Sequence, residues 1–349
     1  MRSSTILGVG AACLVAGLTA CAPQAPAPAA SPAPGQVEAV KPAKLTYAIV
    51  GFSWNNVPEL VAEAKGFWDA EKLTVDTVVA GQSSAVCQQV TARAAEMGEC
   101  SMNDLIQAAE GGAPLQAFQN KTSTALQYGV MTKQAITSWG ALKGKLIMIA
   151  GPKDNTAYYF HIMARPNGLK DDDYDFQFAG SSGARFAALK SGAADAAVLA
   201  FPFDIQAEQE GYRRLGNLLP EFLNADNYAG GGAIARKDWA AEHSDEVVRY
   251  IRSIAKAIDW LYAPANKKEL FDIVKGKLNL TEEAFEQVYK ASLVDSKQFS
   301  TDGRFKDGAV AGVMKGLVDL GSLKDPLPPA TKYYDNTYVD RARKDLGKQ

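Results

Sequence analysis

Short loops that combine hydroxyl, amide, carboxylate and aromatic side chains recur along the sequence, each where an apolar segment gives way to a helical pattern. A Ser, Asn or Asp at such a point caps the helix, and the free N–H groups and positive dipole end there attract an anion or a strong hydrogen-bond acceptor. If the loops converge, they form a binding site for a small solute. The candidate contacts are Phe52, Ser53, Trp54, Asn55, Gln82, Ser83, Ser84, Asn103, Asp104, Asn155, Thr156, Tyr158, Ser182, Arg185, Phe201, Asp204 and Tyr228.

Each Ser, Asn or Asp taken alone is more often a helix cap than a ligand contact, so the prediction depends on convergence. Trp54 is flanked by polar residues in a loop, and we expect it to contact the ligand although aromatic residues more often join a core. With Phe201 and Tyr158 it favours a flat or amphipathic ligand. Arg185 can pair with a carboxylate on that ligand, or it can lie on a solvated helix face.

The residue pattern does not favour an enzyme. The two histidines, His161 and His243, lie in no metal-binding spacing, and the sequence has neither a Gly-x-Ser-x-Gly motif nor a phosphate-binding glycine loop. We therefore predict no catalytic residue, no metal and no cofactor. A secreted hydrolase stays the alternative.

Short strands that alternate with helices must position the loops. An alternating β-rich segment at 45–50 precedes helical spacing at 57–65, the helix-ending Gly66 and a strand at 73–79. A helix at 85–97 that ends at Gly98, a strand at 99–102, a helix capped by Asn103 and Asp104, and strands at 115–119 and 127–131 are expected next.

A related order recurs in the second half. Both halves have Ser-Ser before a helix, a glycine after it, a short strand and an Asp-capped helix. Alternating strands and helices favour parallel sheets, which bind ligands at the carboxyl ends of their strands, so we predict two facing lobes with a cleft between them. Helices at 239–262, 270–278 and 282–291 are expected to pack on the first lobe.

The N-terminus reads as a targeting segment. Arg2 precedes an apolar run, and residues 1–20 are typical of a secretory signal peptide. The run ends in Leu-Thr-Ala-Cys at 18–21, which resembles a bacterial lipobox and implies lipidation of Cys21 and attachment to a membrane; the alternative is an ordinary signal with a chance cysteine. The Pro/Ala-rich residues 21–42 read as an extended tether.

Charge and cysteine usage bound the remaining roles. The formal net charge is −2 and no long basic run occurs, so nucleic acid is not an expected partner. Cys87 and Cys100 remain after Cys13 leaves with the signal peptide and Cys21 takes lipid. Outside the cytoplasm these two can form a disulfide, or they can be two buried thiols.

Four motifs, in order, resemble the periplasmic substrate-binding proteins of ABC transporters for sulfonates, nitrate and thiamine-pyrimidine precursors. They are Ala-Lys-Gly-Phe-Trp at 64–68 followed by Leu-Thr-Val at 73–75, Gly-Gly-Ala-Pro-Leu at 111–115, Leu-Lys-Gly-Lys at 142–145, and Leu-Lys-Ser-Gly-Ala-Ala-Asp-Ala at 189–196. The segment 98–104 is shorter than the family pattern, so the pocket wall near Ser101 to Asp104 is expected to differ.

The resemblance implies an α/β fold of the two-lobed periplasmic-binding-protein type (type II), each lobe a mostly parallel sheet flanked by helices. It implies a first lobe from 43–132 and 227–349 and a second from 133–226. It also implies a monomeric, non-enzymatic protein of the cell envelope that carries a small ligand to an ABC permease. The alternative on this fold is a pyrimidine-synthase-like enzyme.

Overall fold

The computed structural model describes residues 40–123, 128–152, 154–218 and 229–348. The predicted signal peptide, the lipidation site Cys21, nearly all of the tether, and Tyr228 lie outside these residues. Lys41–Gln349 forms one unit, distinct from Met1–Val40, and this unit contains two five-stranded sheets.

The first sheet has the order β2-β1-β3-β10-β4. Its strands are β1 (Ala43–Ile49), β2 (Leu73–Val79), β3 (Met97–Cys100), β4 (Leu115–Asn120) and β10 (Gly232–Arg236). β1 runs parallel to both β2 and β3, whereas β10 is antiparallel to β3 and to β4. One reversed strand therefore lies inside an otherwise parallel sheet.

The second sheet repeats this plan in the order β7-β6-β8-β5-β9. Its strands are β5 (Tyr128–Thr132), β6 (Leu146–Ile149), β7 (Asp175–Phe178), β8 (Ala196–Ala200) and β9 (Arg213–Asn217). The reversed strand is β5, antiparallel to β8 and β9. In each sheet the reversed strand is the first strand after the chain crosses over from the other sheet: β5 follows β4, and β10 follows β9. The two halves therefore share this feature, in line with their predicted internal similarity.

The strand pairing differs from the predicted lobe boundary after residue 132. Residues 43–132 were expected to form part of the first lobe, but β5 at the end of that range pairs with β8 and β9 of the second sheet. Its apolar and glycine-containing sequence fits either sheet, so the sequence alone does not assign it.

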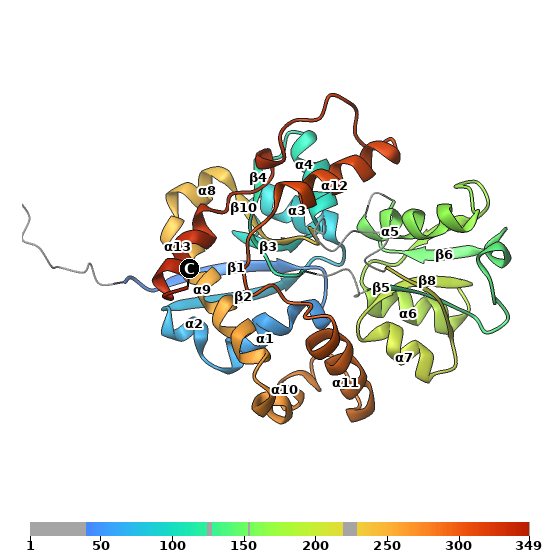
Figure 1. Ribbon diagram of the computed structural model, residues 1–349, viewed down its shortest axis with the longest axis horizontal. Coiled ribbons are helices and arrows are strands. Elements are labelled where there is room, and N and C mark those ends of the chain that lie inside the picture. The colour runs from blue at the N-terminus through green and yellow to red at the C-terminus, as the bar shows by residue number, and fades with distance from the viewer. Residues whose placement is uncertain (1–39, 124–127, 153, 219–228, 349) are drawn as a thin grey trace, which may run out of the picture. The chain divides into compact units, whose positions relative to one another are not determined.

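Helices cover both faces of the first sheet, with α1 (Val57–Ala64) and α9 (Ser244–Leu261) on one face and α3 (Ser83–Thr91) and α4 (Met102–Glu110) on the other (Figure 1). The α1 and α9 core also takes in residues of α2 (Phe67–Ala70), α8 (Lys237–Glu242), α10 (Lys267–Val274), α11 (Glu282–Tyr289) and α13 (Thr337–Asp345). α12 (Asp307–Asp319) joins α3 and α4. The C-terminal helices thus pack on the first lobe, as predicted.

The second sheet lies between α5 (Asn155–Ala164) and the pair α6 (Ser182–Ser191) and α7 (Phe203–Gln209) (Figure 1). The predicted glycine end of α6 is present, since Gly192 has φ +83° at its C-terminus. This positive φ suits a glycine, which has no Cβ to collide with the backbone.

Two predicted helices differ from the structure. The helix expected at 85–97 ends at Thr91, and Gly98 lies inside β3, where a Cβ would come within 2.6 Å of Val86 Cγ1 and 2.8 Å of Ala48 O. Gly98 is therefore required for close strand packing rather than for ending a helix. The helix expected at 239–262 is interrupted at His243, which separates α8 from α9.

Candidate functional site

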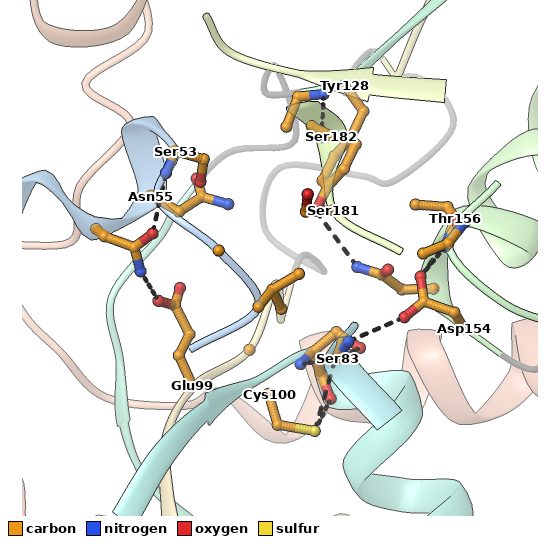
Figure 2. A pocket seen from close by; sticks show the side chains of 18 of the residues that line it. Ser53, Asn55, Ser83, Glu99, Cys100, Tyr128, Asp154, Thr156, Ser181 and Ser182 are labelled. Atoms are coloured by element: carbon orange, nitrogen blue, oxygen red, sulfur yellow. Dashed lines mark hydrogen bonds between the residues drawn. The ribbon is translucent and has the colours of Figure 1, made fainter. Parts of the chain in front are cut away.

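A polar cavity of about 70 Å³ lies where loops at the carboxyl ends of β1, β3, β6, β7 and β8 meet. Figure 2 shows Ser53, Asn55, Ser83 and Glu99 from the first lobe and Tyr128, Thr156, Ser181 and Ser182 from the second around a common centre. A volume of this size holds roughly five water-sized groups. The loops predicted to converge thus do so in part, around a space suited to a small molecule.

The first-lobe wall is built by the turn after β1. Ser53 has an extended backbone at φ −150° and precedes the short 3₁₀ helix η1 (Trp54–Asn56), and its N–H donates to Asn56 Oδ1 at 3.2 Å. Trp54 N donates to Phe201 O at 3.1 Å, which fixes this turn to the loop after β8. Ser53, Asn55 and Asn56 all line the cavity.

An ion cluster lies under this wall. Glu99 of β3 lines the cavity, and its Oε2 accepts bonds from Lys121 Nζ at 2.9 Å and Asn56 Nδ2 at 2.7 Å. Lys121 is fully buried and also pairs with Glu59 of α1. Burial raises the pKa of Glu99 to about 7 although the Lys121 charge opposes this. Two carboxylates therefore share one ammonium at the floor of the site.

Helix N-termini face each other across the cavity. Asp154 caps α5 by accepting from Thr156 N at 3.0 Å, and its other oxygen accepts from Ser83 N, at the start of α3, at 3.1 Å. In return, Asp104 of α4 accepts from Asn155 N at 3.4 Å. Burial, and next the charge of Asp154, raises the pKa of Asp104 to about 8. The acids at these helix starts thus join the lobes to each other.

The second-lobe wall is organised around Arg185. Its Nε donates to Val198 O at 2.7 Å, Nη2 donates to Ser182 Oγ at 2.7 Å, and Nη1 donates to Gly180 O. Only 2% of the residue is exposed, and burial lowers its pKa. Arg185 therefore lies at the cavity, as predicted, and each of its nitrogens donates to the protein. Its alternative as a solvated helix residue is wrong, because the side chain is buried.

Eight of the predicted contacts line the cavity. They are Phe52, Ser53, Asn55, Ser83, Asn155, Thr156, Ser182 and Arg185. Each belongs to a loop or to the first turns of a helix that follows a strand, and their contact with a ligand stays a prediction.

Trp54 does not line the cavity. Its side chain is fully buried in the first-lobe core, where Nε1 donates to Ser292 Oγ at 2.6 Å and the ring lies 6.1 Å from that of Phe285. The η1 turn points its neighbours Ser53 and Asn55 to the cavity and the indole away from it. The expectation that Trp54 contacts ligand is therefore not met.

Two further aromatic candidates, Tyr158 and Phe201, pack between the lobes and do not line the cavity. The Tyr158 ring packs against α12, where a Cβ at Gly316 would lie 2.9 Å from Tyr158 Cε2. Phe201 is buried against the first-lobe core. Both were expected at the ligand, but both occupy the packing between the lobes.

The other predicted contacts have structural partners. Asn103 and Asp104 are bonded by the Ser101 hydroxyl at 2.8 and 2.6 Å. Asp204 is fully buried and pairs with Arg214 at 2.7 Å. Gln82 precedes α3 and Ser84 lies in its first turn, and neither lines the cavity.

Sequence reasoning missed Glu99 and Tyr128 as cavity residues, and it placed Asp154 and Ser181 in the ligand-binding loops as helix caps rather than as individual contacts. Glu99 lies within a short strand, where alternation alone does not show which face a side chain takes. Tyr128 was assigned to the other lobe. A carboxylate flanked by Gly98 and Cys100 in an otherwise apolar strand was the available signal.

Cys87 of α3 and Cys100 of β3 form a disulfide with a Cα–Cα distance of 6.2 Å. The bridge ties α3 to the strand that carries Glu99, and Cys100 itself lines the cavity. Of the two alternatives that the sequence left open, the structure has the bridge.

Within the described residues, no group of His, Cys, Asp and Glu side chains is arranged to hold a metal ion. A search of the same residues finds no helix with the length and apolar character to cross a membrane.

Comparison with solved structures shows the fold. A protein from Bordetella bronchiseptica RB50 is 22% identical, with a TM-score of 0.75 over 87% of this chain and 98% of that one. The alkanesulfonate-binding protein SsuA from Xanthomonas axonopodis pv. citri, bound to MOPS, is 15% identical, with a TM-score of 0.70 over 85% and 100%. The periplasmic nitrate-binding protein NrtA from Synechocystis PCC 6803 is 11% identical, with a TM-score of 0.70 over 87% and 89%.

The predicted two-lobed periplasmic-binding-protein fold is confirmed by these similarities and by the two matching sheets. No protein with a curated description matches the chain. The family model described as NMT1/THI5 like matches residues 53–267, more than half of the sequence, and the chain belongs to that family.

Proposed function

We propose that this protein is the solute-binding component of an ABC importer, which captures a small organic solute between its lobes and delivers it to a permease in the cytoplasmic membrane. The observation that carries the proposal is the polar cavity bounded by strand-end loops of both lobes. A ligand in that position contacts both halves at once and stabilises their closed arrangement.

The similar structures support this reading. SsuA and NrtA, whose names state binding of alkanesulfonate and nitrate, share the fold over most of this chain. For this chain we propose the same kind of role, with a ligand that is small, because the cavity measures about 70 Å³.

The proposal includes export and anchoring. Residues 1–20 are removed, Cys21 carries lipid, and residues 21–42 tether the two lobes to a membrane of the envelope. The first lobe consists of the segments that build the β2-β1-β3-β10-β4 sheet, and β5 belongs to the second lobe. Labelling cells with radioactive palmitate tests the anchor: the wild-type protein takes up label, and Cys21→Ala does not. Equal labelling of both would contradict lipidation at Cys21.

A thermal-shift screen of sulfonates, nitrate, carboxylates, amino compounds and pyrimidines tests binding, since a ligand raises the melting temperature by mass action. Tyr128→Phe removes a hydroxyl at the cavity and is expected to weaken binding of any hit. Tyr174→Phe is the matched control. The Tyr174 hydroxyl is hydrogen-bonded to His161 Nδ1 at 2.8 Å, and Tyr174 does not line the cavity. Turnover of a solute without any thermal shift would instead support the enzyme alternative.

A further inference from the structure

Two carboxylates, Glu99 and Asp154, and one guanidinium, that of Arg185, line the cavity, and Asp154 and Arg185 are held by bonds to the protein. Both oxygens of Asp154 accept bonds, from Thr156 N and from Ser83 N. The Arg185 nitrogens donate to two backbone carbonyls and to Ser182 Oγ. Both oxygens of Asp154 and all three nitrogens of Arg185 therefore already bond to the protein.

Glu99 is the exception. Its Oε2 accepts from both Lys121 and Asn56, but no described residue donates to Oε1, and 17% of the side chain is exposed. Figure 2 shows the side chain rising from β3 on the first-lobe side of the cavity, with Tyr128 and Ser182 on the other side. The charged atom available to a ligand is therefore an acceptor oxygen.

Two hydroxyl groups of the second lobe, those of Ser182 and Tyr128, line the same cavity. Ser182 Oγ already accepts from Arg185 at 2.7 Å and from Ala200 N at 3.1 Å, so its hydrogen is left to donate. Tyr128 Oη accepts from Asn155 Nδ2 at 3.4 Å and keeps its own hydrogen for another partner. The cavity thus offers an acceptor from one lobe and donors from the other.

The balance of charge points the same way. The carboxylates at or directly beneath the cavity are Glu99, Glu59, Asp104 and Asp154, and the cations there are Lys121 and Arg185. Because Asp104, with a pKa of about 8, stays mostly protonated at pH 7, the ionisation of Glu99 decides whether negative charges outnumber the two cations. A cationic group on the ligand favours the ionised form of Glu99, whereas a purely anionic ligand does not.

We propose that the solute carries a primary amine, which donates to Glu99 Oε1, and an acceptor group that faces Ser182 and Tyr128. This inference rests on the proposed function and deepens it by naming the chemistry of the ligand. A molecule with an amine at one end and a small acid at the other satisfies both walls, and roughly five to seven heavy atoms fit the volume. Nitrate and simple alkanesulfonates lack the group that Glu99 requires.

Matched pairs of solutes isolate the amine. The probes are 2-aminoethanesulfonate with ethanesulfonate, 3-aminopropanoate with propanoate, and 4-aminobutanoate with butanoate, each pair differing by the amino group. Their dissociation constants are measured by titration calorimetry on the full chain without its signal peptide. We expect at least one amino member to bind on the order of tenfold or more tightly than its partner, as a charge-assisted hydrogen bond predicts.

Two variants distinguish a direct contact between Glu99 and the amine from an indirect effect of the Lys121 ion cluster. Glu99→Gln keeps an oxygen for Lys121 and Asn56 but replaces the free carboxylate oxygen, and it is expected to reduce the amine preference to about twofold or less. Glu59→Gln removes a carboxylate from the same Lys121 cluster without lining the cavity, so the preference is expected to persist. Loss of the preference in Glu59→Gln alone would overturn the direct role of Glu99.

The pH dependence gives a further reading. The titratable and charged groups around Glu99 are Lys121, Glu59, Tyr47, Tyr128, Asp154 and Arg185. An aliphatic amine stays cationic between pH 6 and 8, where Glu99 with a pKa of about 7 loses its proton. Amine binding should therefore strengthen as pH rises through this window, and Glu99→Gln should flatten the change.

Tight binding of a solute that lacks the amino group, such as propanoate, would overturn the inference. Amine binding that weakens with rising pH and is unaffected by Glu99→Gln would also overturn it. Either result would leave the solute-binding proposal standing. Failure of every amino member to bind would also overturn the inference. The proposed function would then be judged by the remaining sulfonates, nitrate, carboxylates and pyrimidines of the thermal-shift screen.

Discussion

Replacing Trp54 with Ala tests whether this side chain serves the core or the ligand. The indole is fully buried, donates to Ser292 Oγ at 2.6 Å and packs near Phe285. Truncating a buried aromatic side chain costs about 3–5 kcal/mol, because apolar burial is lost and a cavity is left. Of this, the lost hydrogen bond accounts for about 1 kcal/mol. We expect Trp54→Ala to lower the free energy of unfolding by that total.

Denaturant titration followed by circular dichroism measures the change. Ser292→Ala leaves the indole N–H without its acceptor and should cost about 1–3 kcal/mol. The two losses should not add in the double variant, because Trp54→Ala has already removed the shared bond. Trp239→Ala is the matched control: Trp239 is partly buried and stacks on His243 at 4.7 Å, so its loss should be clearly smaller.

The opposite pattern would refute this reasoning. If Trp54→Ala kept the wild-type unfolding free energy within about 1 kcal/mol and abolished binding of a solute found in the thermal-shift screen, the indole would act on the ligand. A loss as large for Trp239→Ala would show that any tryptophan truncation destabilises the protein, and the assignment of Trp54 to the core would lose its support.

Three further predictions concern buried charge and the disulfide. Lys121→Met leaves the two buried carboxylates that it bridges without a cation, and denaturant titration should show a loss of about 3–5 kcal/mol; an unchanged midpoint would contradict the ion cluster. Asp104 has a pKa raised from 3.8 to about 8, so the folded protein keeps a proton that the unfolded chain releases, and stability should fall as pH rises through this range. Asp104→Asn should make that decline shallower in titrations at pH 5 and pH 8, and parallel declines in both proteins would argue against it. Replacing Cys87 and Cys100, 13 residues apart, by Ala should cost about 3 kcal/mol by loop-closure entropy in the same assay, and an equal stability of both forms would contradict this.

Local signals in the sequence predicted most of the elements correctly. The strand 73–79 has the bounds of β2, and the expected left-handed glycine after α1 is Gly66 at φ +66°. Ser181 accepts from Ala184 N at 3.4 Å as the cap of α6. Caps and glycines depend on a few neighbouring residues, so a single sequence reveals them and, with them, the loops that line the cavity.

Contacts between distant segments could not be predicted in this way. Whether Trp54 faces core or cavity depends on Ser292, which lies in a later helical segment. The partners of Glu99 are Asn56, before α1, and Lys121, beyond α4, and Lys121 in turn pairs with Glu59 of α1. The early end of α3 depends on Arg93 taking φ +64°, a conformation for which Arg carries no signal.

The position of β10 between β3 and β4 affects the order in which a nascent chain can fold. Among the described strands β4 pairs with β10, which is made only after every strand of the second sheet. A chain that emerges from its N-terminus can therefore complete the second sheet while β4 still has no neighbour. The strands synthesised first then belong to the half of the molecule that is finished last.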